Sequence, residues 1–238
     1  GSLPDTDHVA ACVRAGLDEI GSVMSRHASE VTLPRQVAAG IGDLLHPLLR
    51  HRTAPPTIFA TELNRTVLFR ELADRMAREP ERCVGAYNAA VARHSSAGMR
   101  PLLADDIQDR FELPLWWLPP GGPRQHVYAE MLGQIPLSEL APKALFMTGL
   151  LRLAGCDLFI HGTGGGGAEG EAAHEGYDLV TDEWLAVWLG ITRDALAPIT
   201  VVSATRFLPL EAAEPPAPSV VDRAEWMSNS ARHSPYLL

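Results

Sequence analysis

Two neighbouring motifs combine residue types that could do chemistry. The first, "DLFIHGTGGGG" at residues 157–167, is an apolar run that ends in His161 and a row of glycines. The second, "YDLVTDEW" at residues 177–184, places Asp178 and Asp182 four residues apart. Carboxylates at this spacing share a helix face, and an imidazole with two carboxylates can bind a divalent cation. A metal site of these three residues is therefore one hypothesis, and helix capping by the acids is the alternative.

The glycine row could admit a ligand against the backbone. Glycine has no side chain to keep a ligand away, so backbone binding is expected at Gly162, Thr163, Gly164 and Gly165. No G-x-S-x-G elbow is present, which argues against an α/β-hydrolase serine nucleophile. The row also matches neither of the usual phosphate loops, GxGxxG and GxxxxGK[ST], and the acids that follow it would repel a bare phosphate.

Polar residues follow two further apolar runs, "IFA" and "TVV". The candidate ligand-binding residues there are Asn64, Arg65, Ser203, Thr205 and Arg206. If the runs are parallel strands, their endings meet with that of the His161 strand at one edge of a sheet, where α/β proteins bind ligands. Two arginines suit a carboxylate or phosphate, and His161 or Glu62 could carry a proton. Ordinary surface positions for the arginines are the alternative.

The elements that must position these residues follow from the hydrophobic pattern. Apolar residues at helical spacing predict helices that cover residues 13–24, 37–48, 68–76, 80–91, 142–155 and 177–190. Short β-type runs are "TIFA", "CDLFIHG" and "APITVVSATRFLPL", and residues 111–130 read as a β-hairpin. Pro114 cannot donate a ladder hydrogen bond, so its strand is expected at a sheet edge.

The order helix, strand, helix, strand from residue 142 to 210 predicts a parallel β-α-β unit. The fold class is therefore α/β, with a mixed sheet and an additional helical N-terminal layer. An α+β fold with a separate N-terminal bundle is the alternative. We expect a single domain over residues 1–210, with residues 1–50 as a helical part that could be a subdomain, and a proline-rich tail at 211–238.

The tryptophan pair Trp116 and Trp117 places one ring on each side of the hairpin strand. One ring is expected in the core. The other could stack on a ligand, stack on Arg124 across the hairpin, or be covered by the N-terminal helices.

Composition excludes several partners. The chain has 238 residues and a formal charge of −9 without a long basic run, which argues against nucleic acid. Its three cysteines form no CxxC pair, as is usual in a reducing cytoplasm. The longest apolar run, at residues 144–156, is interrupted by Arg152 and is too short to cross a membrane. An almost complete preference for arginine over lysine suggests a GC-rich bacterial genome, and Gly1-Ser2 is typical of a cloning scar.

The segments "LAPKALFMTGLLRLAGCDLFIHGTGG", "YDLVTDEWLAVWLGI" and "VVSATRFLPL" together resemble a family of uncharacterised bacterial proteins with an HGxGG loop followed by YDxxTDxW. The resemblance covers roughly residues 112–210 and implies no known activity. It also implies that residues 166–176 are an insertion. The expected function is an enzyme-like domain that binds a small polar, anionic metabolite, with a divalent metal left open as cofactor. The alternative is a non-catalytic interaction or dimerisation module, with a homodimer left open.

Overall fold

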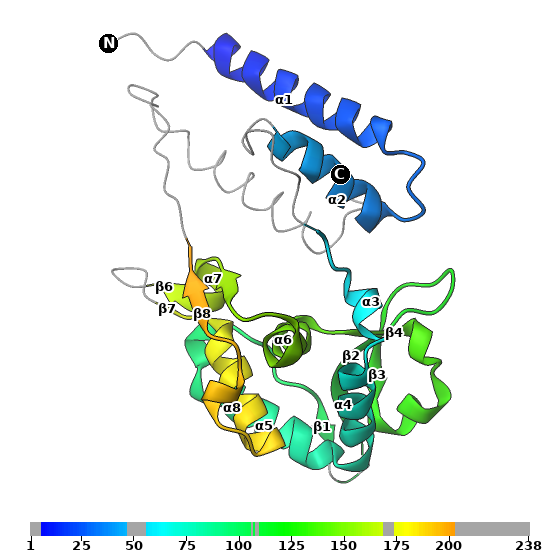
Figure 1. Cartoon of the computed structure of the whole chain (residues 1–238), viewed down its shortest axis with the longest axis vertical. Coiled ribbons are helices and arrows are strands. Elements are labelled where there is room, and N and C mark those ends of the chain that lie inside the picture. The colour runs from blue at the N-terminus through cyan, green and yellow to red at the C-terminus, as the bar shows by residue number, and fades with distance from the viewer. Residues whose placement is uncertain (1–5, 47–55, 106, 108–109, 169–173, 203–238) are drawn as a thin grey trace. The chain divides into compact units, whose positions relative to one another are not determined.

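The computed structural model describes residues 6–46, 56–105, 107, 110–168 and 174–202. The chain divides into two compact units, one made of residues 1–55 with 206–238 and the other of residues 56–205 (Figure 1). The first unit contains the N-terminal helices. The single domain over residues 1–210, with residues 1–50 as a helical part that could be a subdomain, stays a prediction. The expected tail at residues 211–238 lies outside the described residues.

Two helices make up the described part of the first unit, α1 (Thr6–Arg26) and α2 (Leu33–Leu45). Pro34 lies in the first turn of α2, where its missing N–H is not needed. The two helices contact each other closely at Gly40, which lies against Val23 and Met24. Both helices were predicted from their apolar spacing, and the structure confirms them.

The second unit is mainly helical. Its long helices are α4 (Val67–Arg78), α5 (Pro80–Arg93) and α8 (Tyr177–Leu189), and the shorter ones are α3 (Ala60–Leu63), α6 (Ala144–Leu150) and α7 (Thr163–Gly166). Helix α6 continues into a π-helical turn at Leu151–Gly155. The prediction of a strand at "TIFA" was wrong, because α3 begins within that run.

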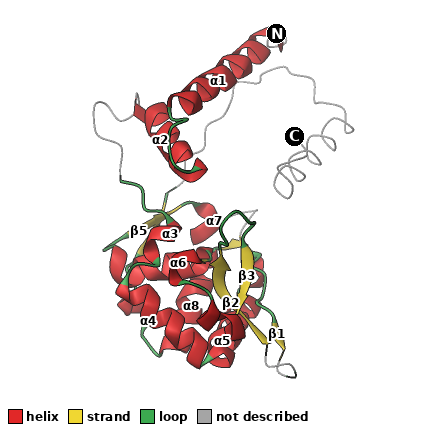
Figure 2. Ribbon diagram, turned by 90° about the vertical axis from the view of Figure 1, so that its right-hand side faces the viewer, coloured by secondary structure: helices red, strands yellow, loops and turns green. Residues whose placement is uncertain are grey.

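An antiparallel sheet contains β1 (Ala104–Asp105), β2 (Arg110–Trp117), β3 (Gln125–Tyr128) and β4 (Leu140–Pro142). The predicted hairpin is confirmed as β2 and β3, which lie side by side in Figure 2. Strand β2 is central, however, because β1 and β4 also pair with it. The prediction of an edge position for Pro114 was therefore wrong. Proline is tolerated there because the β2–β3 register is irregular between Leu113 and Trp116.

A second sheet pairs β5 (Phe159–His161) with β8 (Ile199–Val201) in parallel. Helix α8 lies between them in sequence, so the predicted β-α-β unit and the α/β class are confirmed. The parallel and antiparallel strands belong to separate sheets, whereas one mixed sheet was expected. Strand β5 is only partly buried, and Ile160 is 61% exposed. The short strands β6 (Gly167–Ala168) and β7 (His174–Glu175) form an antiparallel pair.

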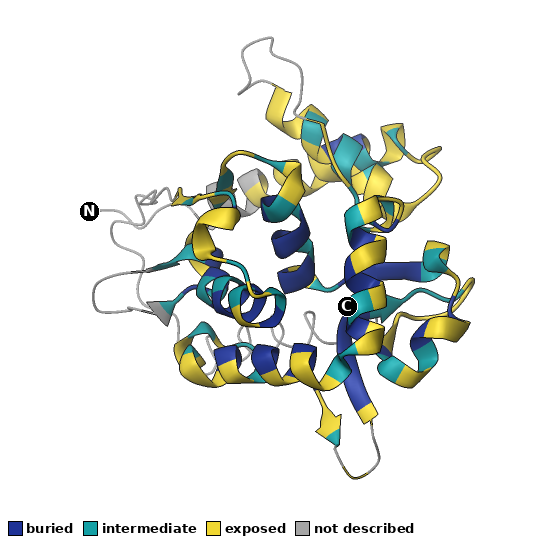
Figure 3. Cartoon of the chain, turned by 60° about the horizontal axis from the view of Figure 1, so that its bottom comes forward, coloured by how far each residue is buried: buried dark blue, intermediate teal, exposed yellow. Residues whose placement is uncertain are grey.

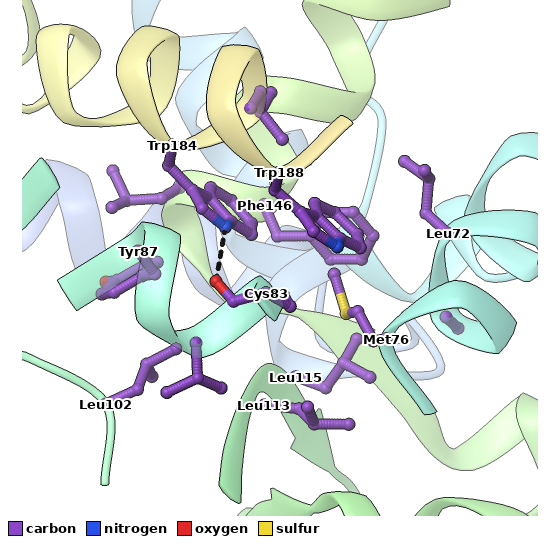
Figure 4. Packing of buried hydrophobic residues seen from close by; sticks show 14 of the residues in the cluster. Leu72, Met76, Cys83, Tyr87, Leu102, Leu113, Leu115, Phe146, Trp184 and Trp188 are labelled. Carbon is purple, nitrogen blue, oxygen red and sulfur yellow. Dashed lines mark hydrogen bonds between the residues drawn. The ribbon is translucent and has the colours of Figure 1, made fainter. Parts of the chain in front are cut away.

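The core of this unit lies where α5, α6 and α8 pack together, as Figure 3 shows by the dark blue faces of its helices. Trp184 and Trp188 of α8 are fully buried and stack in parallel, with ring centroids 5.6 Å apart (Figure 4). Phe146 and Tyr87 meet the Trp184 ring edge-on. Val187 of the same helix lies outside this core and is 57% exposed.

Within the described residues, every helix is either too short or too polar to cross a lipid bilayer.

Candidate functional site

The carboxyl end of β5 brings His161 against the first turn of α8. Gly176 is the N-cap residue of α8, so Tyr177 and Asp178 are its first two helical residues. Nδ1 of His161 lies 2.8 Å from Oδ2 of Asp178, and Nε2 lies 3.1 Å from the hydroxyl of Tyr177. The three side chains therefore form a continuous hydrogen-bonded chain.

The neighbouring groups determine where the protons lie along these hydrogen bonds. Burial, followed by the charge of Asp178, raises the pKa of Tyr177. A carboxylate can only accept, so the contact with Asp178 assigns the proton of a neutral His161 ring to Nδ1. In that tautomer Nε2 accepts a hydrogen bond from the Tyr177 hydroxyl. The Asp178 side chain is only 4% exposed, so the Nδ1 donor offsets the cost of burying its carboxylate.

Asp178 also lines a pocket of about 600 Å³. Charged side chains in its lining are Asp178, Asp182, Asp194, Arg152 and Arg193. Arg152 is buried, donates through Nε to the carbonyl of Ala197 at 2.9 Å, and forms an ion pair with Asp182. The lining thus holds three carboxylates against two guanidinium groups, which favours a ligand with hydrogen-bond donors over an anion.

The hypothesis of a metal site at His161, Asp178 and Asp182 is not supported. The described part of the chain contains no group of three or more His, Cys, Asp or Glu side chains that could hold a metal ion. The physical reason is that the Asp182 carboxylate is bound by Arg152, while Asp178 alone faces His161. The spacing of four residues did place the acids on one face of α8, but their partners differ.

Some glycines of this loop region are packed against the protein itself, whereas Gly162 and Gly164 face open space. A Cβ atom on Gly165 would overlap the His161 ring, and one on Gly176 would overlap the backbone at Gly165. The N–H groups of Gly165 and Gly166 donate to the carbonyl of Gly162 within the single turn of α7. Of this row, only Gly166 lines the pocket. The candidate ligand-binding residues Gly162, Thr163, Gly164 and Gly165 are not part of this lining, and their role in binding a ligand stays a prediction. At Gly165 the close approach is made by the His161 ring of the same chain.

The "TIFATELNR" residues lie elsewhere in the unit. The carboxylate of Glu62 accepts from the N–H of Phe59 at 3.1 Å at the start of α3, and the amide of Asn64 donates to the carbonyl of Leu140 at 2.8 Å. Asn64 and Arg65 line a pocket of about 330 Å³ that shares no residue with the one at Asp178. The structure therefore does not bring Glu62, Asn64 and Arg65 to His161. The third group, Ser203, Thr205 and Arg206, lies outside the described residues.

Two residues of the site were missed from sequence. Tyr177 directly precedes Asp178, and its role depends on the strand that places His161 beside it. Arg152 was noticed only as the charge that interrupts an apolar run. A lone charge inside such a run is itself a signal, because a buried guanidinium requires a partner such as Asp182.

No protein-family model matches the chain, and searches of curated proteins and of solved structures find no match either. The resemblance based on the HGxGG and YDxxTDxW motifs stays a prediction.

Proposed function

We propose that the unit of residues 56–205 binds a small polar metabolite in the pocket at Asp178 and that Asp178 exchanges a proton with it. The observation that carries this proposal is the hydrogen-bonded chain of Tyr177, His161 and Asp178, in which Asp178 also lines a pocket of about 600 Å³. This volume is within the range of small-molecule sites.

The hydrogen bonds among Tyr177, His161 and Asp178 suit general base chemistry. His161 holds the carboxylate of Asp178 through both of its oxygens, at 3.0 and 2.8 Å. Such a donor fixes the orientation of the carboxylate and stabilises its charged form. A ligand hydroxyl or amine in the pocket would donate to Asp178, which is the geometry that a general base requires. Tyr177 is a positioning residue in this scheme, because it holds the His161 ring from its other nitrogen.

The charge of the pocket defines the ligand class. The sequence favoured an anionic metabolite, but carboxylates outnumber guanidinium groups in this lining. We therefore expect a ligand with hydroxyl or amino groups that donate to Asp178 and Asp194. Arg193, the guanidinium in the lining that is exposed, could bind one carboxylate of a zwitterion.

The test is a ligand-observed NMR screen of polyols, amino alcohols and amino acids against three proteins. These are the unmodified chain, Asp178→Asn, and Asp74→Asn as a control on the exposed face of α4. A ligand of the site should bind the control like the unmodified chain and should bind Asp178→Asn about tenfold more weakly, the usual loss for a charged hydrogen bond. A ligand that all three proteins bind equally would show that Asp178 has no part in recognition.

An interaction module is the second candidate. Leu158, Ile160 and Val202 of the β5–β8 region are 51%, 61% and 60% exposed. Exposed apolar side chains that lie close together are typical of surfaces that contact another protein. Sedimentation velocity of the unmodified chain and of Ile160→Asp would test this candidate. The interaction module is supported if the unmodified chain forms a concentration-dependent dimer that Ile160→Asp abolishes, and if the screen finds no ligand at Asp178.

A further inference from the structure

A second cluster of charged side chains lies at the hairpin, away from the residues used so far. A pocket of about 330 Å³ is lined by Arg100, Arg124 and Lys143, with the carboxylate of Glu112 among them. Glu112 and Trp116 of β2 pair with Tyr128 and His126 of β3, which share one face of that strand because side chains alternate. Trp116 is therefore part of the same wall, and its partner across the hairpin is His126.

The base of the pocket is a buried ion cluster. The Glu112 side chain is 3% exposed, and both of its oxygens accept from Nη2 of Arg100, at 2.9 and 2.8 Å. Oε1 also lies 2.6 Å from Nζ of Lys143, and Oε2 accepts from the N–H of Leu103 at 3.1 Å. Two cations therefore already neutralise the one carboxylate before Arg124 is considered.

Lys143 is the only lysine of the chain. Its side chain is 15% exposed, and Nζ lies 4.8 Å from the centre of the Trp116 ring. Burial lowers the pKa of Lys143, and the hydrogen bond with Glu112 opposes this effect only in part. A further negative charge in the pocket would stabilise the ammonium form, so the site is poised to gain an anion.

Arg124 supplies the free cation. Its guanidinium lies 4.5 Å from the centre of the Trp116 ring, and among the described residues no carboxylate is paired with it. A guanidinium held against an aromatic face keeps its N–H groups available at its edge, where they can bind a carboxylate in a bidentate manner. With Arg124 included, the lining carries two positive charges in excess of its one carboxylate.

The remaining lining is apolar. Tyr87, Met99, Leu102, Ala144 and Leu145 contribute mainly apolar surface to the lining. A bare phosphate would leave this apolar surface covered by water, whereas an organic acid would bury it and gain the hydrophobic contribution. The volume is near the lower limit for small-ligand sites, so the ligand must be small.

We propose that this pocket binds a small organic carboxylate, with Arg124 and Lys143 holding the carboxylate and the apolar surface holding the body of the ligand. The site is independent of the one at Asp178, and the two pockets have no lining residue in common. The preference for an anion that the sequence indicated is thus assigned to the hairpin.

The single lysine makes the test specific. Reductive methylation with formaldehyde and cyanoborohydride modifies amines, so by mass spectrometry every side-chain product in this chain reports Lys143. Benzoate is the probe, with inorganic phosphate and with sodium chloride at equal ionic strength as comparisons. At a benzoate concentration ten times its Kd, mass action leaves roughly one site in eleven free, so methylation of Lys143 should slow about tenfold. The N-terminal amine serves as the internal control.

Two variants complete the experiment. Arg124→Gln, at an exposed position of the hairpin, should keep its melting temperature and bind benzoate about tenfold more weakly, because one charged hydrogen-bonding partner is lost. Arg193→Gln changes the pocket at Asp178. In this variant, benzoate should protect Lys143 from methylation as strongly as it does in the unmodified chain. Three outcomes would each overturn the proposal. Sodium chloride could protect Lys143 as well as benzoate does, phosphate could protect it where benzoate does not, or benzoate could protect it fully in Arg124→Gln.

Discussion

Nδ1 of His161, at the end of β5, lies 2.8 Å from Oδ2 of Asp178, in the first turn of α8. The contact joins the two halves of the β-α-β unit at the carboxyl edge of its sheet, where parallel α/β folds place their ligands. It depends on Gly165, because any larger residue there would occupy the position of the imidazole. The motifs HGTGG and YD are thus two sides of one packed contact.

Replacing Asp178 by Asn should reduce stability by about 1.5 to 3 kcal/mol, the range for a buried hydrogen bond to a charged group. The reason is that His161 loses a charged acceptor at a position with 4% exposure. Urea unfolding gives the free energy, and ¹⁵N shifts of the imidazole show whether the proton remains on Nδ1. Asp74→Asn, on the exposed face of α4, is the control and should change stability by no more than about 0.5 kcal/mol. Equal effects of the two substitutions would refute a role of the contact in stability.

Alanine substitutions should divide the glycines of the loop into two classes. A Cβ atom added at Gly162 or Gly164 would have no other atoms within 4 Å, so alanine should be neutral or stabilise by up to about 1 kcal/mol through the unfolded chain. Gly165→Ala and Gly176→Ala should destabilise, because the added methyl group would overlap the His161 ring or the Gly165 backbone. Melting temperatures of the four variants are sufficient to check this. Equal tolerance at all four positions would contradict this packing.

Regular periodicity explains what could be predicted from sequence. Helices α4, α5 and α8 have apolar residues on one face over several turns, and the hairpin alternates, so both signals are repeated many times. The run "TIFA" is too short for either period to be distinguished, and α3 begins within it. The position of Pro114 in a central strand depended on a register irregularity that no local pattern records.

The site residues depended on contacts between distant segments. A glycine can admit a ligand or a neighbouring side chain, and only the position of β5 against α8 decides that His161 fills the space at Gly165. Likewise Glu112 and Lys143 are 31 residues apart and meet because β4 pairs with β2 and leads directly into Lys143. The contact of Arg124 with Trp116 is the exception, since hairpin geometry alone made it one of the expected outcomes.

Acid should weaken the fold through Glu112. Burial alone would raise the pKa of Glu112, but hydrogen bonds from Lys143 and from the N–H of Leu103 lower it below the ordinary value of a glutamate. Because the folded pKa is lower than the unfolded one, the stabilisation is present above about pH 4.3, the ordinary glutamate pKa, and is lost as the pH falls through the folded pKa. Glu112→Gln should therefore cost about 3 kcal/mol near neutral pH, through the unpaired Lys143, and less in acid.

Urea unfolding at about pH 7 and about pH 3.5 measures this difference. Glu81→Gln, at an exposed position in the first turn of α5, is the matched control and should change stability by no more than about 0.5 kcal/mol at either pH. A cost for Glu112→Gln that is the same at both values would mean that the ionised carboxylate does not stabilise the folded state.

The stacked tryptophans of α8 should differ in how much their N–H groups contribute to the stability of the fold. Both rings are fully buried, but only Nε1 of Trp184 donates, to the carbonyl of Cys83 at 3.2 Å (Figure 4). Among the described residues, Nε1 of Trp188 has no partner. Phenylalanine removes similar apolar area at either position, but Trp184→Phe also removes a hydrogen bond, whereas Trp188→Phe removes a buried donor that lacks one. We expect Trp184→Phe to be the more destabilising by about 1 kcal/mol or more. Urea unfolding of the two variants decides the question, since a larger loss for Trp188→Phe would show that its N–H is satisfied in solution.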